Sequence, residues 1–143
     1  MTLDRPSRIA VVEDEQSDLT FIRKAFERGS LTHEVQEFGT GRAFLDYFSN
    51  AVEPNPPPDL VLLDLSLPVM SGLDVLSEVR NGAVCPNVVI IVLTSSSYRV
   101  EVEEAYGTGA NAFVTKPARL SELDDLVQLI ENFWLGMAQL PYS

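Results

Sequence analysis

Polar side chains that could do chemistry follow several of the apolar runs in this sequence. They are Glu13 and Asp14 after the first run, Asp64 after the third, Thr94 at the end of the fourth and Lys116 after the fifth. Three carboxylates in one crevice would repel one another, and burial would raise their pKa values unless a cation lay among them. Hard oxygen ligands that are open to water suit Mg²⁺, which often completes its shell with phosphate oxygens. Lys116 would then supply a charge, and Thr94 a hydroxyl donor, to a phosphoryl group.

Asp64 is the acid best placed to accept that phosphoryl group. Asp59 begins the same apolar run, so five residues of strand separate the two carboxylates by about 17 Å. Asp74 falls inside a predicted helix. Asp64 follows the central run, and a carboxylate at that position can act as a nucleophile that forms an aspartyl phosphate.

The elements that must bring these residues together alternate between strand and helix. Strands are predicted at 8–14, 33–38, around 60–63, 87–94 and 111–115, and helices at 17–29, 40–50, 71–82, about 97–108 and from about 119. Parallel neighbours need crossover connections, so the pattern predicts an α/β fold, a doubly wound five-stranded parallel sheet with helices on both faces. The carboxyl ends of all five strands then share one edge, where such sheets bind ligands.

Composition limits the classes of function. The chain has 143 residues, 45% of them hydrophobic, which fits one domain with a sizeable core. Its net charge of −11 repels phosphate backbones and anionic lipid, so we expect no nucleic acid and no membrane as partner. The sequence has no 18-residue apolar run and no signal-peptide core, which favours a cytoplasmic protein. Cys85 and His33 are too few for a zinc site, and His33 is predicted to be a surface imidazole.

Four motifs resemble the receiver domains of two-component response regulators. They are VVED (11–14), PDLVLLDLSLPVMSGLDVL (58–76), VIIVLTSSS (89–97) and GANAFVTKP (109–117), and they keep the family's order and spacing over nearly the whole chain. The resemblance implies a flavodoxin-like receiver fold with strand order 2-1-3-4-5. It also implies a single receiver domain over residues 1–143, with an extended C-terminal helix and tail from about 119 and no effector domain.

The resemblance also implies how the acids work. Asp64 would be phosphorylated by a sensor histidine kinase or a phosphotransfer protein, with Mg²⁺ as the cofactor. Glu13, Asp14, Asp64 and the backbone carbonyl of Ser66 would hold the ion. The domain would carry a signal and would not be an enzyme in the usual sense, although its own phosphorylation and dephosphorylation are chemical steps.

The remaining motif residues resemble the family's switch. Lys116 and Thr94 match the residues that bind the phosphoryl group, and Phe113 matches the aromatic switch position, which would pass the change to the surface of the fourth helix, fifth strand and fifth helix. Many relatives carry tyrosine where this chain has Phe113, so a hydrogen bond from that hydroxyl is absent here. The family usually has a cis peptide bond between the lysine and the proline, which is expected here between Lys116 and Pro117.

The C-terminal stretch predicts a long helix with two apolar stripes. The stripes are Leu123, Val127, Ile130 and Trp134, and Leu126, Leu129, Phe133 and Met137. One stripe should cover the sheet, and we expect Phe133, Trp134 and Met137 to mark a partner or self-association surface. The alternative is an ordinary amphipathic helix with a few exposed apolar residues. The ending ENFWLGMAQLP resembles the tails of single-domain regulators linked to bacterial phytochrome kinases, which implies a homodimer and a light-sensing kinase as partner.

Two other functions remain open at this stage. An aspartate-nucleophile Mg²⁺ phosphatase also uses a carboxylate at a strand end, but it usually has a second acid two residues later, where this chain has Ser66. A phosphate-independent interaction domain could share the fold without the chemistry. The presence of Asp64, Thr94 and Lys116 together argues against that second alternative.

Overall fold

The chain folds around one parallel β-sheet, and the computed structural model describes residues 6–29, 32–49 and 52–142. The strands are β1 (Ser7–Val12), β2 (His33–Phe38), β3 (Leu60–Leu63), β4 (Val89–Thr94) and β5 (Ala112–Thr115). Their order in the sheet is β2-β1-β3-β4-β5, and every neighbouring pair is parallel. The predicted α/β class and the predicted strand order are therefore confirmed.

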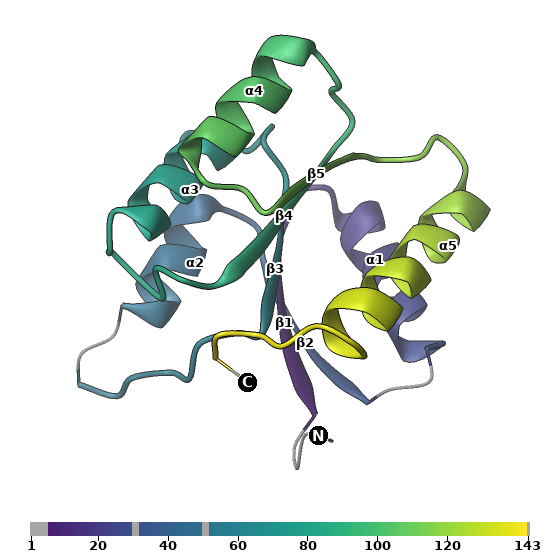
Figure 1. The fold of residues 1–143 in the computed structure, drawn as a ribbon, viewed down its shortest axis with the longest axis horizontal. Helices are drawn as coiled ribbons and strands as arrows, with labels where there is room; N and C mark the ends of the chain where they lie inside the picture. The colour runs from purple at the N-terminus through teal and green to yellow at the C-terminus, as the bar shows by residue number, and fades with distance from the viewer. Residues whose placement is uncertain (1–5, 30–31, 50–51, 143) are drawn as a thin grey trace.

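Helices cover both faces of the sheet. They are α1 (Gln16–Glu27), α2 (Gly41–Phe48), α3 (Gly72–Arg80), α4 (Arg99–Thr108) and α5 (Leu120–Ile130), and α5 runs on into a π-helix, η1 (Glu131–Leu135). Figure 1 shows α1 and α5 packed on one face, and α2, α3 and α4 on the other. Within the described ranges, no helix is long and apolar enough to cross a membrane.

Each face of the sheet has its own hydrophobic core. Along β1, Ile9 and Val11 belong to the core under α1 and α5, while Ala10 and Val12 belong to the core under α2, α3 and α4. Successive residues of a strand point to opposite faces, so a strand buried on both sides must be apolar at every position. This requirement explains why the central runs of the sequence contain no polar residue until they reach the edge of the sheet.

The register of the strands brings the polar residues to one edge. Val12 pairs with Leu63, so Glu13 and Asp64 leave β1 and β3 at the same level. β4 and β5 run in the same direction, and Lys116 is the first residue after β5. The arrangement of the strands alone thus brings Glu13 and Lys116, which are more than 100 positions apart in the sequence, into contact.

The start of α3 lies directly against the end of β3. Ser71 caps the helix by accepting from the Asp74 backbone N–H at 3.2 Å, and the Asp74 side chain accepts from the Ser71 backbone N–H. Gly72 donates its backbone N–H to the Leu65 carbonyl at 3.0 Å. A Cβ on Gly72 would lie 2.2 Å from the Asp64 carbonyl oxygen, so only glycine lets α3 begin this close to the site.

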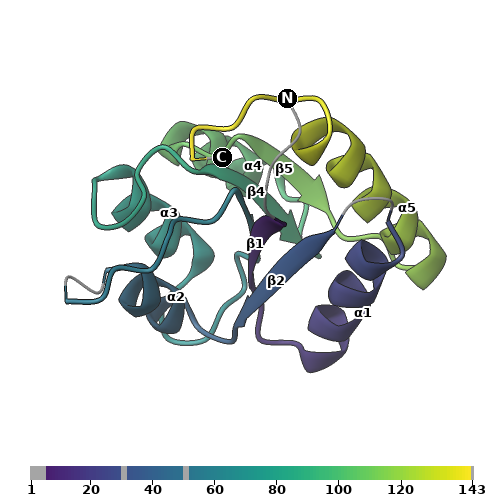
Figure 2. The same ribbon diagram turned by 90° about the horizontal axis from the view of Figure 1, so that it is seen from below.

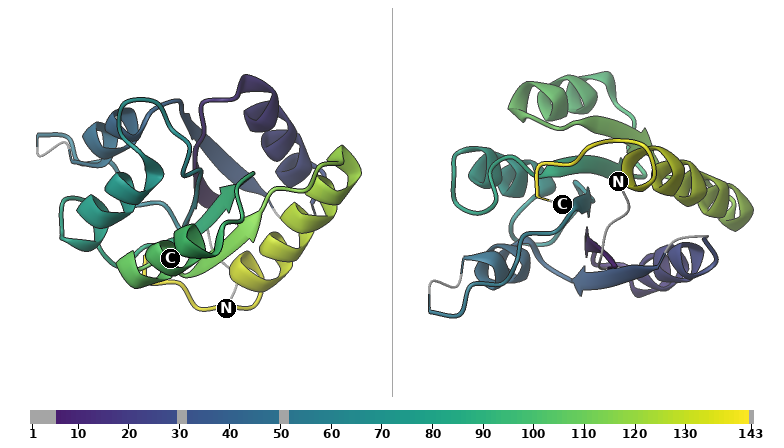
Figure 3. Two further views of the ribbon diagram at one scale, coloured as in Figure 1. Left: turned by 90° about the horizontal axis from the view of Figure 1, so that it is seen from above. Right: turned by 60° about the horizontal axis from the view of Figure 1, so that its bottom comes forward.

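The C-terminal segment is not the single long α-helix that the sequence predicts. After Ile130 the backbone hydrogen bonds join residues five apart, which is the π-helical pattern. One example is the 3.0 Å bond from the Gly136 N–H to the Glu131 carbonyl. The tail then crosses the molecule toward the α3 side, as Figures 2 and 3 show in yellow. Leu140 packs against the α1/α5 core and Tyr142 against the other core, so the tail connects both faces of the sheet.

Two local predictions are wrong. The His33 side chain is only 2% exposed, and its Nε2 lies 2.7 Å from Oε2 of Glu131, which is equally buried. The Phe26 ring meets the imidazole edge to face. The expected cis bond between Lys116 and Pro117 is also absent, because the described chain contains no cis peptide bond. The trans form is the ordinary state of a bond before proline.

Candidate functional site

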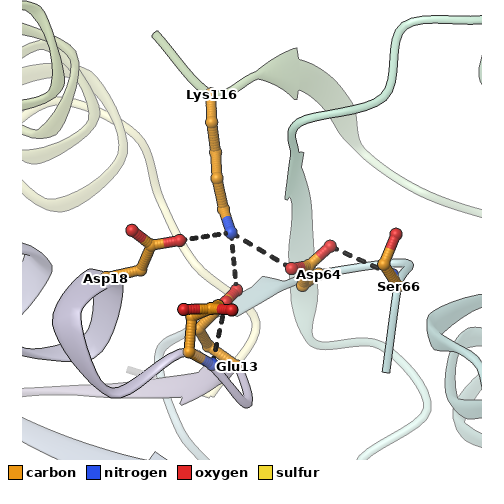
Figure 4. Close-up of polar contacts among 6 residues, drawn as sticks. Glu13, Asp18, Asp64, Ser66 and Lys116 are labelled. Atoms are coloured by element: carbon orange, nitrogen blue, oxygen red, sulfur yellow. Dashed lines mark hydrogen bonds and ion pairs between the residues drawn. The ribbon is translucent and has the colours of Figure 1, made fainter. Parts of the chain in front are cut away.

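The Lys116 ammonium is the centre of the polar cluster at the carboxyl edge of the sheet. Its Nζ donates to Glu13 Oε2 at 2.8 Å, to Asp18 Oδ2 at 2.9 Å and to Asp64 Oδ2 at 3.1 Å (Figure 4). The side chains of Lys116, Glu13 and Asp64 are 10%, 2% and 5% exposed. An ammonium has three N–H donors, so these carboxylates use all of them.

Three acids beside the ammonium have the composition of a divalent-cation site. Glu13, Asp14 and Asp64 each offer a carboxylate oxygen, and these oxygens lie within 4.8 Å of one another. Glu13 and Asp64 are buried, whereas Asp14 is exposed, so the cluster is open to water on one side. Such a partly hydrated set of hard oxygen donors fits Mg²⁺ or Mn²⁺. Ser66 lies next to it and donates its backbone N–H to Asp64 Oδ1 at 3.0 Å.

The buried acids share their charge unequally. Burial raises the pKa of Glu13 to about 8, and its hydrogen bond to Asp64 acts in the same direction. Burial also acts to raise the pKa of Asp64, but hydrogen bonds from Glu13 and the Ser66 N–H, with the nearby Lys116 charge, hold this pKa below its usual range. Glu13 therefore holds its proton more strongly than Asp64 does.

Lys116 stays charged in this environment. Burial acts to lower the pKa of its ammonium, but the hydrogen bonds to Glu13 and Asp18 outweigh burial and raise the pKa above its usual range. The crevice therefore holds a permanent cation beside an ionised Asp64, which is the arrangement that a carboxylate nucleophile for an anionic substrate needs.

Thr94 and Phe113 lie on neighbouring strands and on the same face of the sheet, the face covered by α4. Thr94 and Val92 point to the same face of β4, and Val92 pairs with Phe113 of β5. Thr94 is fully buried, and its Oγ1 has no hydrogen-bond partner within the described part of the chain. A buried hydroxyl without a partner is costly and marks a place where a ligand can supply the missing bond. Phe113 is half-buried, and its backbone N–H donates to Tyr106 Oη at 3.0 Å.

Comparison with known proteins decides the family. The model of the response regulator receiver domain matches residues 9–128. The chain belongs to the response regulator receiver domain family. It is accordingly a signalling domain of two-component systems, as the four motifs predict.

Relatives of this receiver domain include phytochrome response regulators. Response regulator Rcp1 of Synechocystis sp. is 32% identical over 138 residues, which cover 95% of this chain and 94% of Rcp1. The crystal structure of the phosphorylated cyanobacterial phytochrome response regulator RcpA has a TM-score of 0.89 at 32% identity and covers 96% of this chain and 99% of that one. The Mn²⁺-bound form of Rcp1 has a TM-score of 0.86 at 32% identity, with 95% and 99% covered. The predicted likeness to phytochrome-associated regulators is confirmed.

Asp18 is a member of the site that sequence reasoning missed. It lies in the first turn of α1, and its side chain is 31% exposed. The sequence feature that could have indicated Asp18 is its position just after Glu13 and Asp14, at the start of a helix that must begin close to those acids. An acid in a first helical turn is common because of the helix dipole, so that signal by itself indicates nothing about a site.

The residues predicted to form an interface differ in exposure. Phe133 and Met137 are 52% and 74% exposed, and Leu129 on the same stripe is 67% exposed. Trp134 instead packs against the α1/α5 core, with its ring edge to face with Phe133 at 5.0 Å between centroids. The receiver domain therefore presents an apolar strip that runs from α5 through η1 to the turn after it, and the Trp134 ring packs against this strip at Phe133.

Proposed function

We propose that this receiver domain accepts a phosphoryl group on Asp64 from a sensor histidine kinase or a phosphotransfer protein, with Mg²⁺ bound. The observation that carries the proposal is the Lys116 ammonium 3.1 Å from the Asp64 carboxylate, beside the acids Glu13 and Asp14. The existence of phosphorylated and Mn²⁺-bound structures among the relatives supports it. We further propose that residues 1–143 act as one domain, because both cores are built on the same sheet.

In the proposed reaction an oxygen of Asp64 attacks the phosphorus atom. The new O–P bond forms as the P–N bond to the donor histidine breaks, and the bonding electrons leave with the imidazole nitrogen, which takes a proton. Glu13, Asp14, Asp64 and the Ser66 carbonyl would hold the cation, which neutralises charge on the transferring group. The Ser66 N–H orients the Asp64 carboxylate through its 3.0 Å hydrogen bond. Positioning and charge account for most of the catalysis in such transfers.

The switch follows from the unpaired Thr94 hydroxyl. A phosphoryl group adds charge and acceptor oxygens next to β4, so the Thr94 Oγ1 gains the partner that it lacks within the described part of the chain. Its inward shift would leave space for the half-buried Phe113 ring on the neighbouring strand. The change then reaches the surface of α4, β5 and α5, where a partner reads it.

The phosphoryl acceptor is tested by incubating the protein with acetyl phosphate and Mg²⁺ and measuring its intact mass. The wild type should gain one phosphoryl group, and Asp64→Asn should gain none. Asp46→Asn is the matched control, because Asp46 is an exposed carboxylate on α2 and should leave the adduct unchanged. Turnover of acetyl phosphate without an adduct would favour the phosphatase alternative. The absence of both turnover and adduct would favour the phosphate-independent interaction domain.

We also propose that the α5–η1 strip of Leu129, Phe133 and Met137 binds a second copy of this chain, and that the kinase is of the phytochrome type. The exposure of the strip and the similarity to RcpA support these proposals. Light scattering of Phe133→Ser with Met137→Ser should give the monomer mass where the wild type gives a dimer. Val52→Ser removes an apolar side chain elsewhere that is even more exposed, at 90%, and should leave the dimer intact. A monomeric wild type, with and without the phosphoryl group, would contradict the dimer.

A further inference from the structure

We propose that Asp18 is a positioning residue for Lys116: it is the one carboxylate that keeps its bond to the ammonium while the other two change partners. The inference rests on the proposed transfer to Asp64 and deepens it. It starts from the three bonds that Lys116 Nζ makes, to Glu13, to Asp18 and to Asp64, at 2.8 to 3.1 Å.

These bonds leave the ammonium with no free donor. A lysine has three N–H groups and no other way to contact an anion, so a phosphoryl oxygen can bind Lys116 only when a carboxylate releases it. The position of the Lys116 ammonium during the transfer therefore depends on which carboxylate releases it.

Glu13 and Asp64 are the partners that have another role. Both belong to the group of acids whose oxygens lie within 4.8 Å of one another and that could hold a cation. When a phosphoryl group is attached to Asp64, the negative charge lies on the phosphoryl oxygens and no longer on the carboxylate, so the ammonium is drawn from the carboxylate to those oxygens. Asp18 lies outside that group and accepts no phosphoryl group, so its bond to Lys116 is the one with no reason to break.

The backbone holds Asp18 in place independently of the site. It lies in the first turn of α1, where the helix dipole favours a carboxylate. The side chain of Lys116, by contrast, has four carbons and many rotamers, and fixing it costs conformational entropy. With Asp18 bound, one N–H of Lys116 stays anchored and two remain for phosphoryl oxygens. Without Asp18, an ammonium that Glu13 and Asp64 have released keeps none of its three carboxylate partners.

The pair itself is measured first, in protein without metal. Urea unfolding in EDTA is compared for the wild type, Asp18→Asn, Lys116→Met and the double variant, which isolates the coupling between the two side chains. Asp18→Asn should lower the urea midpoint of the wild type by more than that of Lys116→Met, in which only the helix-dipole contribution of Asp18 is lost. Equal effects in both backgrounds would show that Asp18 does not act through Lys116 and would overturn the inference.

The consequence for transfer is measured with acetyl phosphate and Mg²⁺. The energy of a partly exposed ion pair of this kind corresponds to about a fivefold change in a rate constant. Asp18→Asn should therefore be phosphorylated about five times more slowly than the wild type. Asp18→Glu, which keeps the charge, should recover part of the rate. Glu15→Gln removes one exposed carboxylate from the same loop and should react like the wild type.

The possible failures are distinguishable. A wild type that takes up no phosphoryl group contradicts the proposed function. A wild type that is phosphorylated, with Asp18→Asn equally fast or faster, contradicts only the role of Asp18. The faster result would mean that Asp18 holds Lys116 away from the phosphoryl group and does not position it.

Discussion

Replacing Glu13 with glutamine should stabilise the metal-free protein, although it changes a residue of the site. Glu13 is 2% exposed, and burial with the neighbouring Asp64 raises its pKa from 4.5 to about 8. Glutamine has nearly the same shape, can still accept from the Lys116 ammonium and can donate to Asp64. The substitution therefore removes the cost of keeping Glu13 protonated in the folded protein at neutral pH. It keeps the contacts with Lys116 and Asp64 while losing the 3.2 Å bond that Glu13 Oε1 accepts from the Glu15 N–H.

The expected gain depends on pH in a defined direction. Below pH 4.5, Glu13 is protonated in both the folded and the unfolded chain and costs nothing. As the pH rises from 4.5 to about 8, the unfolded chain releases this proton while the folded protein keeps it, so the wild type loses stability over that window. At pH 7 the accumulated difference in the free energy of unfolding is about 3 kcal/mol in favour of Glu13→Gln.

Urea unfolding in EDTA at several pH values between 5 and 8 measures this difference. With a typical slope of about 2 kcal/mol per molar urea, the midpoint of Glu13→Gln at pH 7 should be about 1.5 M higher than that of the wild type. Added Mg²⁺ should reduce the difference, because the wild type binds the ion more tightly through its carboxylate. Glu15→Gln, at an exposed acid nearby, should show no such pH dependence. A variant that is less stable than the wild type at pH 7, or a gain that does not grow with pH, would refute the reasoning.

Three further substitutions test the packing that positions the site, each by urea unfolding at neutral pH. Gly72→Ala places a Cβ 2.2 Å from the Asp64 carbonyl oxygen, so it should lower the free energy of unfolding by about 2 kcal/mol and slow phosphorylation. A wild-type stability together with a wild-type phosphorylation rate would contradict this close approach. Glu131→Ala leaves the 2%-exposed His33 imidazole without its 2.7 Å hydrogen-bond partner and should lower the free energy of unfolding by about 2 kcal/mol, and an unchanged midpoint would mean that this buried contact is unimportant. Phe44→Ala opens a cavity in the core under α2 and α3 and should cost about 3 to 5 kcal/mol, whereas a loss below 1 kcal/mol would mean that this core repacks freely.

Most of the fold could be predicted from the sequence because its signals are local. The runs around Val11, Leu62 and Ile91 are apolar at every position, which is typical of strands covered on both faces, and helical stretches separate them. A parallel sheet then places the ends of its strands at one edge by geometry alone. For this reason Glu13 and Asp64 could be expected to meet before any coordinates were known.

The parts that could not be predicted depend on side-chain reach and on distant packing. Nothing in the sequence around Asp18 says that its carboxylate reaches the Lys116 ammonium, since that depends on how α1 is tilted against β5. The burial of His33 depends on Glu131, which is 98 residues away and is turned inward where α5 becomes a π-helix. Such a change of helix type has no strong local signal, so the sequence predicted an ordinary α-helix there.

Locating the phosphoryl group in the chain tests whether Asp64 is the residue that carries it. After treatment with acetyl phosphate and Mg²⁺, borohydride reduction converts the acyl phosphate to an alcohol, which marks the residue permanently, and peptide mass spectrometry then finds the mark. One mark is expected, on Asp64, and none when EDTA replaces Mg²⁺. A mark on Glu13, Asp14 or Asp18 in place of Asp64 would contradict that expectation.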